Sequence, residues 1–288
     1  MRFPDSLIRR SDTHKNNYGH VLVIGGSRGM TGSVCLCSMS ALKIGAGLVT
    51  IAVPDSISPI VSVKITEPMI MSLPSTSDGT INYRAVKHIF KSISRYNVLA
   101  IGCGGSRNRS SARFFRYIVK NTAQGIVVDA DAINAFSGNP DDLADRKTDK
   151  LVLTPHSGEF SRLINKDKIL VEKDRKTLAK DFALKYNLVL VLKGDKTIVT
   201  DGKTLYENDT GNPGMATAGM GDCLTGIIAG LMAQNLSALD SACLGVYLHG
   251  LAGDIAVLDK TQYCIIAQDI IDYLPVAIKQ TIHMDKPA

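Results

Sequence analysis

The sequence lacks the features that would place it in several special classes of protein. No two of its six cysteines have the C-x-x-C spacing of a zinc site, and no basic run is long enough to indicate nucleic-acid binding. Residues 1–10 contain no apolar core of signal-peptide length. The longest uncharged stretch, near residues 223–239, contains Gln234 and Asn235, whereas a membrane span needs roughly 20 mostly apolar residues. We therefore expect a cytoplasmic protein with no structural zinc, no nucleic-acid partner and no membrane span.

The chain is also without a proline- or serine-rich linker, an internal repeat or a low-complexity tract, so we expect one domain over residues 1–288. Hydrophobic residues make up 45% and charged residues 21% of the composition, which is enough apolar material for a sizeable core. The formal net charge of +6 would suit a polyphosphate substrate, although a charge that only aids solubility explains it equally well. The cysteines lie mostly in apolar segments, where they act as small hydrophobic residues, and this favours a reducing compartment.

Short runs of β-branched residues alternate with helical stretches along the chain. Such strand–loop–helix–strand units are typical of a parallel sheet in an α/β protein. We expect strands at residues 21–25, 48–53, 98–101, 126–128, 151–153, 188–192, 197–200 and 204–207. The last two flank Asp201-Gly202, which is a good hairpin turn. The C-terminal part of the chain is predicted to be mostly helical, and one helix face there would carry Leu224, Ile227, Ile228 and Leu231.

Polar residues follow the carboxyl ends of several predicted strands. In open parallel sheets ligands bind outside these ends, so residues distant in sequence would gather along one edge of the sheet. The residues concerned are Asp129, Asp131, His156, Glu159, Lys193 and Asp195. The sequence therefore predicts a ligand site at this edge.

The most informative motif is the glycine-rich segment of residues 211–226, which leads into an apolar helix. Gly219 and Gly221 would let the backbone approach a ligand closely, and the free N–H groups at the helix start would form an anion site suited to phosphate. Asp222 beside this site could remove a proton from a hydroxyl as it attacks phosphorus. A simple helix cap explains Asp222 equally well from local physics alone.

Two common phosphate-binding loops are excluded by their spacing. Residues 202–204 (Gly-Lys-Thr) end like a Walker A loop, but Thr197 stands where its first glycine is needed. Gly102 and Gly104 begin like a Rossmann fingerprint, but Arg107 occupies the position of its third glycine. Any phosphate binding must therefore use another loop.

Two further motifs at strand ends carry groups suited to ligand binding. In residues 193–197 (Lys-Gly-Asp-Lys-Thr) the lysine could neutralise phosphate and the glycine could admit a nucleotide, although a solvated β-turn is the simpler interpretation. In residues 154–159 (Thr-Pro-His-Ser-Gly-Glu) His156 could donate to a substrate carbonyl or phosphate, and Glu159 could hold a metal-bound water. A lone histidine is more often structural, and a helix cap is the simpler interpretation of Asp131.

The motifs also form an ordered series. They include HKNNYGHVLVIGGS at residues 14–27, MTGS at 30–33, KIGAGLV at 43–49, DADA at 129–132, LTPHSGE at 153–159, KGDKT at 193–197, GNPGMAT at 211–217, AGMGDCLTG at 218–226 and HGLAGD at 249–254. This series resembles the NAD(P)H-hydrate dehydratase family, a branch of the ribokinase-like proteins, over about residues 12–275. Each motif is weakly specific alone, but their order is highly specific. The resemblance implies a ribokinase-like three-layer α/β fold with a mostly parallel central sheet flanked by helices.

The resemblance implies a repair reaction. Such enzymes use ADP or ATP to dehydrate the damaged 6-hydroxy form of NADH or NADPH, by phosphorylating the hydroxyl and then losing phosphate. Asp222 would be the base on that hydroxyl, and the backbone amides around Gly219 and Gly221 would form the anion hole. Mg²⁺ is expected to accompany the polyphosphate, with no direct protein ligand identified.

The binding roles of the family transfer to matching positions. ADP or ATP would contact Lys193, Gly194, Asp195, Lys196, Thr197 and Gly221. The hydrate would contact Ser33, Gly104, His156 and Asp222. The chain departs from the family where Ser33 replaces the usual alanine, and in residues 102–106, where Gly-Cys-Gly-Gly-Ser replaces Gly-Pro-Gly-Leu-Gly.

The resemblance also implies partners. The chain would form a homo-oligomer such as a tetramer, and a separate NAD(P)H-hydrate epimerase would act with it. Two alternatives share parts of the site: a vitamin-precursor kinase of the hydroxymethylpyrimidine or hydroxyethylthiazole type, and a nucleotide-binding sensor without turnover. His156 and residues 30–33 favour the dehydratase over the kinase, and Asp222 argues against a sensor, which needs no base.

Overall fold

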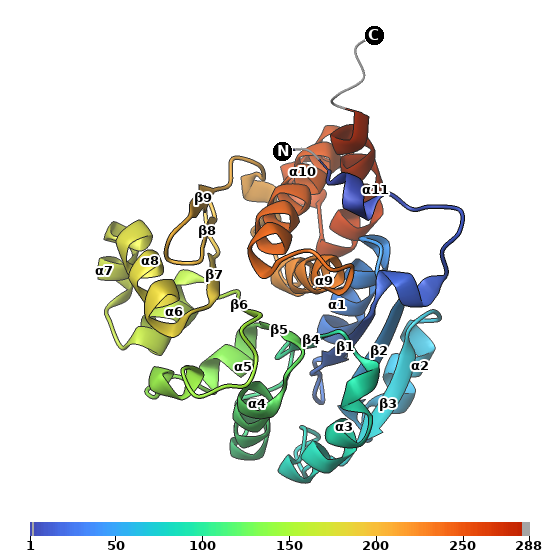
Figure 1. Cartoon of the computed structure of the whole chain (residues 1–288), viewed down its shortest axis with the longest axis vertical. Helices are drawn as coiled ribbons and strands as arrows, with labels where there is room; N and C mark the ends of the chain where they lie inside the picture. The colour runs from blue at the N-terminus through green and yellow to red at the C-terminus, as the bar shows by residue number, and fades with distance from the viewer. Residues whose placement is uncertain (2, 284–288) are drawn as a thin grey trace.

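A nine-stranded sheet forms the centre of the protein (Figure 1). The structure is a computed structural model that describes residue 1 and residues 3–283. The strands are β1 (His20–Ile24), β2 (Leu48–Pro54), β3 (Met69–Leu73), β4 (Val98–Ile101), β5 (Gly125–Val128), β6 (Leu151–Leu153), β7 (Val189–Leu192), β8 (Ile198–Thr200) and β9 (Leu205–Glu207). Their order across the sheet is β3-β2-β1-β4-β5-β6-β7-β8-β9.

The strands from β3 to β7 in this order run parallel, and β8 and β9 extend the sheet as an antiparallel hairpin. The predicted parallel sheet, the hairpin at Asp201-Gly202 and every predicted strand are confirmed, with bounds that agree to within one residue. The edge strand β3 was not predicted.

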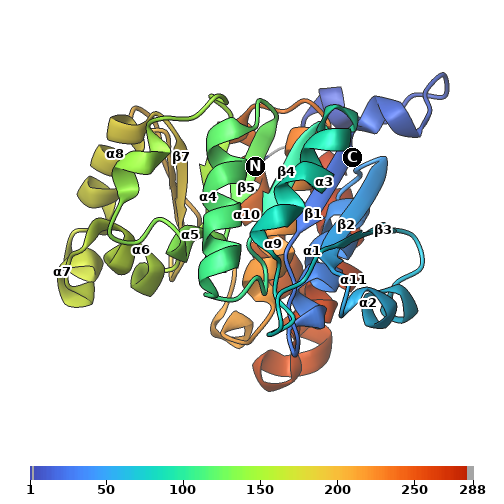
Figure 2. The same cartoon turned by 90° about the horizontal axis from the view of Figure 1, so that it is seen from below.

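Helices cover both faces of the sheet and make three layers (Figure 1). One face carries α1 (Thr31–Lys43), α2 (Ser58–Lys64), α9 (Met220–Ala233) and α10 (Ala238–Cys264), with α11 (Ala267–His283) packed against them. The other carries α3 (Val86–Ser92), α4 (Arg109–Asn121), α5 (Ala130–Asn134), α6 (Ser157–Ile164), α7 (Lys168–Lys173) and α8 (Arg175–Tyr186). In Figure 2, α3 and α4 lie in front of the sheet, and α9 and α10 lie behind it. The expected three-layer arrangement is confirmed.

Short 3-10 turns connect these elements, at Asp5–Leu7, Lys15–Tyr18, Tyr83–Ala85, Ile93–Arg95, Pro140–Leu143 and Pro213–Met215. The strands themselves are apolar on both faces because helices cover both. In β1, Leu22 and Ile24 belong to the core under α3 to α8, whereas Val21 and Val23 belong to the core under α1, α9 and α10. Such continuous apolar strands are typical of a parallel sheet.

The helix α9 lies between the sheet and the outer helices. Leu224 and Ile228 pack in the core next to the sheet, whereas Ile227 and Leu231 pack in the core shared with α10 and α11. These four residues share one arc of α9, as predicted, but the helix is covered on both sides, so this arc meets two cores. Its start reaches the edge of the sheet where the strands end.

The helix α10 is long and apolar enough to cross a membrane by length and composition alone, with a mean hydropathy of 1.4 over an 18-residue window. This apolar run was not predicted. In the fold, 56% of that window is buried, and Leu244, Leu248 and Ala252 pack in the core shared with α9 and α11. Burial of this kind is typical of a core helix that is hydrophobic nearly all round.

Candidate active site

Loops that follow three neighbouring strands meet at the carboxyl edge of the sheet. Asp129 follows β5, Thr154 follows β6 and Lys193 follows β7. The Lys193 ammonium donates to Asp129 Oδ1 at 2.7 Å, and the Thr154 hydroxyl donates to the same oxygen at 2.9 Å. The Lys193 backbone N–H also donates to Pro155 O at 2.8 Å, which joins the last two loops. The predicted gathering of polar groups is thus present for these residues.

The start of α9 presents backbone N–H groups to this edge. Gly219 precedes the helix with a φ of +92°, a left-handed conformation that glycine adopts without steric cost. No described side chain caps the helix, so its first N–H groups and the positive end of its dipole remain available. Asp222 lies in the first turn without capping it. The cap interpretation of Asp222 is therefore wrong, and the helix start has the geometry of an anion site.

The Asp222 carboxylate faces this edge of the sheet rather than the core. Ligand atoms of Asp222, Asp129 and Cys103 all lie within 4.8 Å of one another. Burial raises the pKa of Asp222 to about 6, the charge of Asp129 adds to this, and hydrogen bonds with Cys103 and Ser33 oppose it. A carboxyl group whose pKa lies near neutrality is well suited to accept a proton.

The Lys193 ammonium lies beside the start of α9. A Cβ atom built on Gly221 would be 3.2 Å from Lys193 Nζ, so the lysine and the helix start are in contact. Burial alone would lower the pKa of Lys193, but the carboxylates of Asp129 and Glu159 raise it above its usual value. The lysine therefore stays charged, and its charge adds to that of the helix dipole where a phosphate group would sit.

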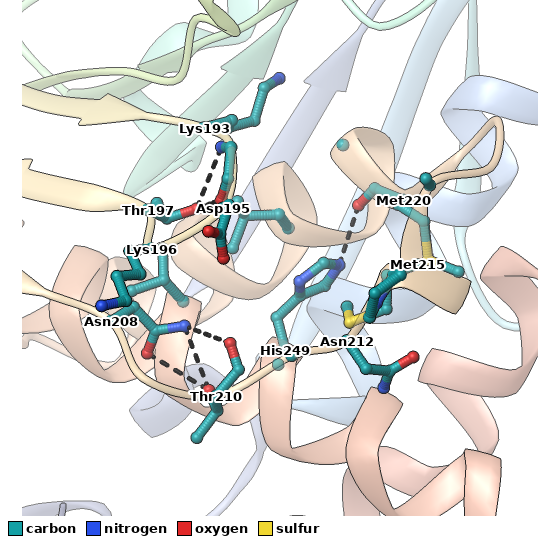
Figure 3. Close-up of a pocket in the computed structure, with 18 residues that line it drawn as sticks. Lys193, Asp195, Lys196, Thr197, Asn208, Thr210, Asn212, Met215, Met220 and His249 are labelled. Atoms are coloured by element: carbon teal, nitrogen blue, oxygen red, sulfur yellow. Dashed lines mark hydrogen bonds between the residues drawn. The ribbon is translucent and has the colours of Figure 1, made fainter. Parts of the chain in front are cut away.

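A cavity of about 480 Å³ opens beside the helix start (Figure 3). Its volume falls in the range of small-molecule sites. The predicted nucleotide-binding residues all line it: Lys193, Gly194, Asp195, Lys196, Thr197 and Gly221. Figure 3 shows the turn of residues 193–197 on one side of the cavity, with Met215, Met220 and His249 on the other. Gly194, Asp195 and Lys196 are exposed, as the solvated-turn interpretation expects, and the same turn also forms a wall of this cavity.

Several residues that line this cavity were not predicted, among them Asn208, Thr210 and His249. Burial lowers the pKa of His249 to about 4, so its ring is neutral near pH 7. Its Nε2 lies 3.0 Å from Met220 O, and since a carbonyl only accepts, Nε2 carries the hydrogen and donates it. His249 thereby holds the first turn of α9. A signal existed in the sequence, because the motif at residues 249–254 belongs to the series described above.

His156 begins α6 and has a structural role in addition to any binding role. Its Nδ1 accepts from Gly158 N at 3.0 Å and from Glu159 N at 3.3 Å, while Glu159 Oε2 accepts from the His156 N–H at 3.0 Å. Burial, aided by the charge of Lys193, lowers the pKa of His156, so the neutral ring carries its hydrogen on Nε2, which lies 3.4 Å from Glu159 Oε1. Glu159 is committed to this capping box, so the expectation of a metal-bound water on it is not supported.

Ser33 and Gly104 lie together next to Asp222. A Cβ atom built on Gly104 would be 3.1 Å from Ser33 Cβ and 2.9 Å from Met30 O, so only glycine fits without displacing its neighbours. Ser33 in turn forms a hydrogen bond with the Asp222 carboxylate. The altered loop of residues 102–106 therefore keeps Gly104 beside Ser33 and brings Cys103 to Asp222.

Asp131 has a different role from the predicted helix cap. The capping position of α5 is Asp129, and Asp131 lies inside the first turn. Asp131 Oδ2 accepts from Ser106 N at 2.8 Å, and its Oδ1 lies 3.9 Å from Arg107 Nε. Asp131 therefore anchors the loop that carries Gly104, and the cap interpretation is wrong.

The residues near Asp222 do not form a site for Mg²⁺. Asp129, Asp222 and Cys103 are the one group of potential ligands close enough together among the described residues. A thiol is a poor ligand for Mg²⁺, which prefers oxygen. The Lys193 ammonium already neutralises Asp129 at 2.7 Å. The donor set therefore does not fit this ion.

Comparisons with known proteins agree with this geometry. A sequence model of the NAD(P)H-hydrate dehydratase family matches residues 21–276. The bifunctional NAD(P)H-hydrate repair enzyme Nnr of Moorella thermoacetica is 43% identical over 273 residues, which are 94% of this chain and 51% of that protein. The ADP-dependent (S)-NAD(P)H-hydrate dehydratase of Listeria monocytogenes is 32% identical over 284 residues, which are 97% of this chain and 95% of that protein. The chain thus spans about half the length of the bifunctional relative and nearly all of the Listeria protein.

Solved structures share the fold. The ADP/ATP-dependent NAD(P)H-hydrate dehydratase from Bacillus subtilis, co-crystallized with ATP/Mg²⁺, superimposes with a TM-score of 0.82 at 26% identity and covers 97% of this chain and 95% of its own. Ribokinase from Giardia lamblia superimposes with a TM-score of 0.59 at 13% identity, over 90% of this chain and 99% of its own, which confirms the ribokinase-like architecture. The family match includes nearly all the residues that meet at the sheet edge, and it extends from β1 into α11. The chain therefore belongs to the NAD(P)H-hydrate dehydratase family.

Proposed function

We propose that this protein dehydrates the 6-hydroxy forms of NADH and NADPH at the expense of ADP or ATP. The observation that carries the proposal is the Asp222 carboxylate, whose pKa is raised to about 6 and which lies at the first turn of α9. Its neighbour Gly221 lines the cavity of residues 193–197, and Asp222 itself contacts Ser33 beside Gly104. A base with a raised pKa between a nucleotide-sized cavity and a second binding surface suits phosphoryl transfer to a hydroxyl.

The proposed reaction has two steps. Asp222 removes the proton of the 6-hydroxyl as the hydroxyl oxygen attacks the terminal phosphorus of the nucleotide. The bond from that phosphorus to the leaving AMP or ADP breaks. The N–H groups at the start of α9 and the Lys193 ammonium stabilise the charge on the transferring group. Phosphate then leaves with the carbon–oxygen bonding pair, and the adjacent ring carbon releases a proton to solvent, so that the electrons of its C–H bond form the double bond of the reduced nicotinamide.

The roles of the other groups follow from their positions. Lys193 to Thr197 and Gly221 would hold the nucleotide, whereas Ser33, Gly104 and the Nε2–H of His156 would hold the hydrate. Mg²⁺ would accompany the phosphates of the nucleotide, and no step above depends on a protein ligand for it. The ATP/Mg²⁺ present with the Bacillus enzyme supports this nucleotide requirement.

We also propose that the protein acts in the cytoplasm as a homo-oligomer, together with a separate NAD(P)H-hydrate epimerase. The bifunctional name of the Moorella relative supports a second repair activity that works beside this one. Sedimentation of the purified protein would test the oligomer, a coupled assay with each epimer of the hydrate would test the epimerase partner, and fractionation of cells would test the compartment.

The decisive experiment is an assay of purified protein with hydrated NADH or NADPH and either ADP or ATP. We expect rising absorbance of the reduced nicotinamide together with phosphate release. Asp222→Asn should lower turnover by about 10²- to 10⁴-fold, the range for loss of a general base. A stable phosphorylated product would favour the vitamin-precursor kinase, nucleotide binding without phosphate release would favour the sensor, and a fully active Asp222→Asn protein would rule out the mechanism.

A further inference from the structure

A second, smaller cavity lies next to the loop that carries Gly104 and the turn that carries His156. It has a volume of about 130 Å³. Its polar lining residues are Arg107 after the 102–106 loop, Asp131 and Asn134 in α5, Ser137 after α5, and Arg162 in α6. It is separate from the cavity of residues 193–197, with which it shares no lining residue.

Arg162 is held in place but not neutralised. Its Nε donates to Asn134 Oδ1 at 3.1 Å, which fixes the plane of the guanidinium group. Its NH1 is 3.8 Å from a Cβ atom built on Gly158, one of the two residues whose N–H groups bond to His156 Nδ1. No carboxylate of the described residues forms an ion pair with Arg162, although Glu159 feels its charge at longer range. The two terminal nitrogens are therefore oriented and have no anionic partner.

Arg107 provides a second guanidinium on the other side of this cavity. Its single carboxylate contact is a distant one, 3.9 Å from Nε to Asp131 Oδ1, and its side chain is 63% exposed. The other oxygen of Asp131 accepts from the Ser106 N–H at 2.8 Å. Asp131 thus anchors the loop that carries Gly104 and leaves Arg107 largely free, and the cavity is bordered by two positive charges and one negative charge.

The positive field of this region reaches the neighbouring histidine. The pKa of His156 is lowered first by burial and then by the charges of Lys193, Arg162 and Lys168, against the opposite effect of Asp129. A Cβ atom built on Gly158 would be 3.2 Å from His156 Nδ1 and 3.8 Å from Arg162 NH1, so the two side chains lie beside the same turn and can act on one ligand. A substrate that contacts His156 and Gly104 through its reacting ring has this cavity within reach of its remaining atoms.

We propose that Arg107 and Arg162 form an anion subsite that binds a phosphate group of the dinucleotide substrate. This inference rests on the proposed function, since it assigns the substrate a second point of attachment. The planar, five-donor guanidinium matches phosphate oxygens in pairs, which an ammonium cannot do. A volume of about 130 Å³ is well above the roughly 10–15 Å³ that one water molecule needs on the same measure, so the cavity has room for a phosphate group.

The phosphate has two possible sources in the substrate. The pyrophosphate bridge occurs in both NADH and NADPH hydrates, whereas the 2′-phosphate occurs only in the NADPH form. Binding of the bridge would lower KM for both hydrates equally. Binding of the 2′-phosphate would make Arg162 a determinant of specificity for the NADPH form.

The test compares Arg162→Gln and Arg107→Gln with the wild-type protein under saturating ADP or ATP. We expect Arg162→Gln to raise KM for the hydrate on the order of tenfold, the size of one lost charged hydrogen bond, and Arg107→Gln to raise it less because that side chain is exposed. The effect on KM should exceed the effect on kcat, since the reacting ring keeps its contacts. The KM for the nucleotide should stay at its wild-type value.

Two further variants control for charge and for folding. Arg162→Lys keeps the charge but not the planar donor group, so it should recover only part of the affinity. Arg95→Gln removes an exposed arginine from the 3-10 turn before β4, at the opposite edge of the sheet, and should leave all constants unchanged. Circular dichroism of each variant checks that the fold is retained.

The outcomes separate this inference from the proposed function. Calorimetric binding of NADPH and NADH, the expected products, tests the subsite even in a protein that turns over neither hydrate. Affinity lost for both products in Arg162→Gln indicates the pyrophosphate, and affinity lost for NADPH alone indicates the 2′-phosphate. Unchanged KM and product affinity in Arg162→Gln and Arg107→Gln would overturn the subsite, whereas absence of wild-type turnover would overturn only the proposed function.

Discussion

At the scale of single residues, the buried charge of Asp222 destabilises the folded protein and at the same time makes this carboxylate a better base. It lies half-buried near a second carboxylate, that of Asp129, and the pKa of Asp222 rises from 3.8 to about 6 as a result. Lys193 does not cancel this cost, because its ammonium is bound to Asp129 at 2.7 Å. The charged form of Asp222 therefore does not stabilise the folded protein.

Removal of this charge should stabilise the protein. Between pH 3.8 and about 6 the folded state binds more protons at Asp222 than the unfolded state, so the free energy of unfolding falls as pH rises through this window. Above about pH 6 the folded protein bears the full electrostatic cost of the charged Asp222 carboxylate. We expect Asp222→Asn to be more stable than wild type by about 1–2 kcal/mol at pH 7, in urea denaturation, with a smaller difference at pH 4. Equal stability at pH 7 would contradict the raised pKa.

Turnover should follow the protonation of the same group. With a pKa of about 6, the basic form of Asp222 is lost as pH falls below that value. We expect kcat/KM to fall about tenfold per pH unit in this acid range and to level off above pH 7. The phosphates of the nucleotide also change protonation in this pH range, so the binding affinity for ADP should be measured over the same range as a control. A rate that stays constant down to pH 5 would exclude Asp222 as the base.

At the scale of elements, the start of α9 depends on a backbone conformation and on close packing at Gly219. This residue has a φ of +92°, and a Cβ atom there would be 2.6 Å from Leu36 Cδ1 and 2.9 Å from Ala267 Cβ. Gly138 has a similar φ of +83° but nothing within 4 Å of an added Cβ. The two glycines therefore separate backbone strain from crowding.

Gly219→Ala should impair both stability and activity, and Gly138→Ala should impair stability alone. The left-handed backbone costs about 1–2 kcal/mol in either variant. At position 219 the Ala267 contact adds to this cost and shifts the first turn of α9, so we expect a loss of turnover of at least tenfold. Thermal denaturation measures the loss of stability, and the absorbance assay of reduced nicotinamide measures the loss of turnover. Wild-type turnover in Gly219→Ala would show that the geometry of the helix start is unimportant.

The sequence predicted most of the sheet because apolar, β-branched runs stopped by glycine or polar residues have few alternatives. The strand β3 was missed since Met69–Leu73 is an edge strand, part exposed, with methionines where the other strands have valine and isoleucine. The two-sided burial of α9 was missed for another reason. Periodicity reports where apolar residues recur, and in a helix as apolar as α9 it cannot tell which neighbour each one meets.

At the scale of the whole molecule, the site is assembled from segments that only the fold brings together. Lys193 and Asp129 could be placed at one edge of the sheet from sequence, but the ion pair between them, which joins the ends of β7 and β5 across β6, could not be predicted. His249 was visible as part of a motif, yet its use depends on the packing of α10 against α9, which places Nε2 at Met220 O. The spacing of motifs in the sequence therefore identifies site residues, but it does not identify which of these residues are in contact.

Nucleotide binding should stabilise the molecule as a whole, because the cavity of about 480 Å³ takes walls from the β7–β8 turn, α9 and α10. A ligand at about 100 times its Kd adds roughly 2.7 kcal/mol to the free energy of unfolding. We expect ADP or ATP to raise Tm by roughly 5–10 °C, measured by differential scanning fluorimetry. Inorganic phosphate at the same ionic strength serves as the control and should produce a much smaller shift. No shift with either nucleotide would mean that this cavity does not bind them.

The burial of α9 has one further consequence. Every residue from 223 to 233 is buried, so this helix has no surface along which to slide or tilt without opening gaps in both layers that enclose it. The carboxylate and the N–H groups at its tip are therefore stationary parts of the scaffold. The nucleotide and the hydrate must therefore be aligned for reaction by their own movement and by movement of the loops that bind them. The Asp222 carboxylate and the N–H groups of α9 keep their positions.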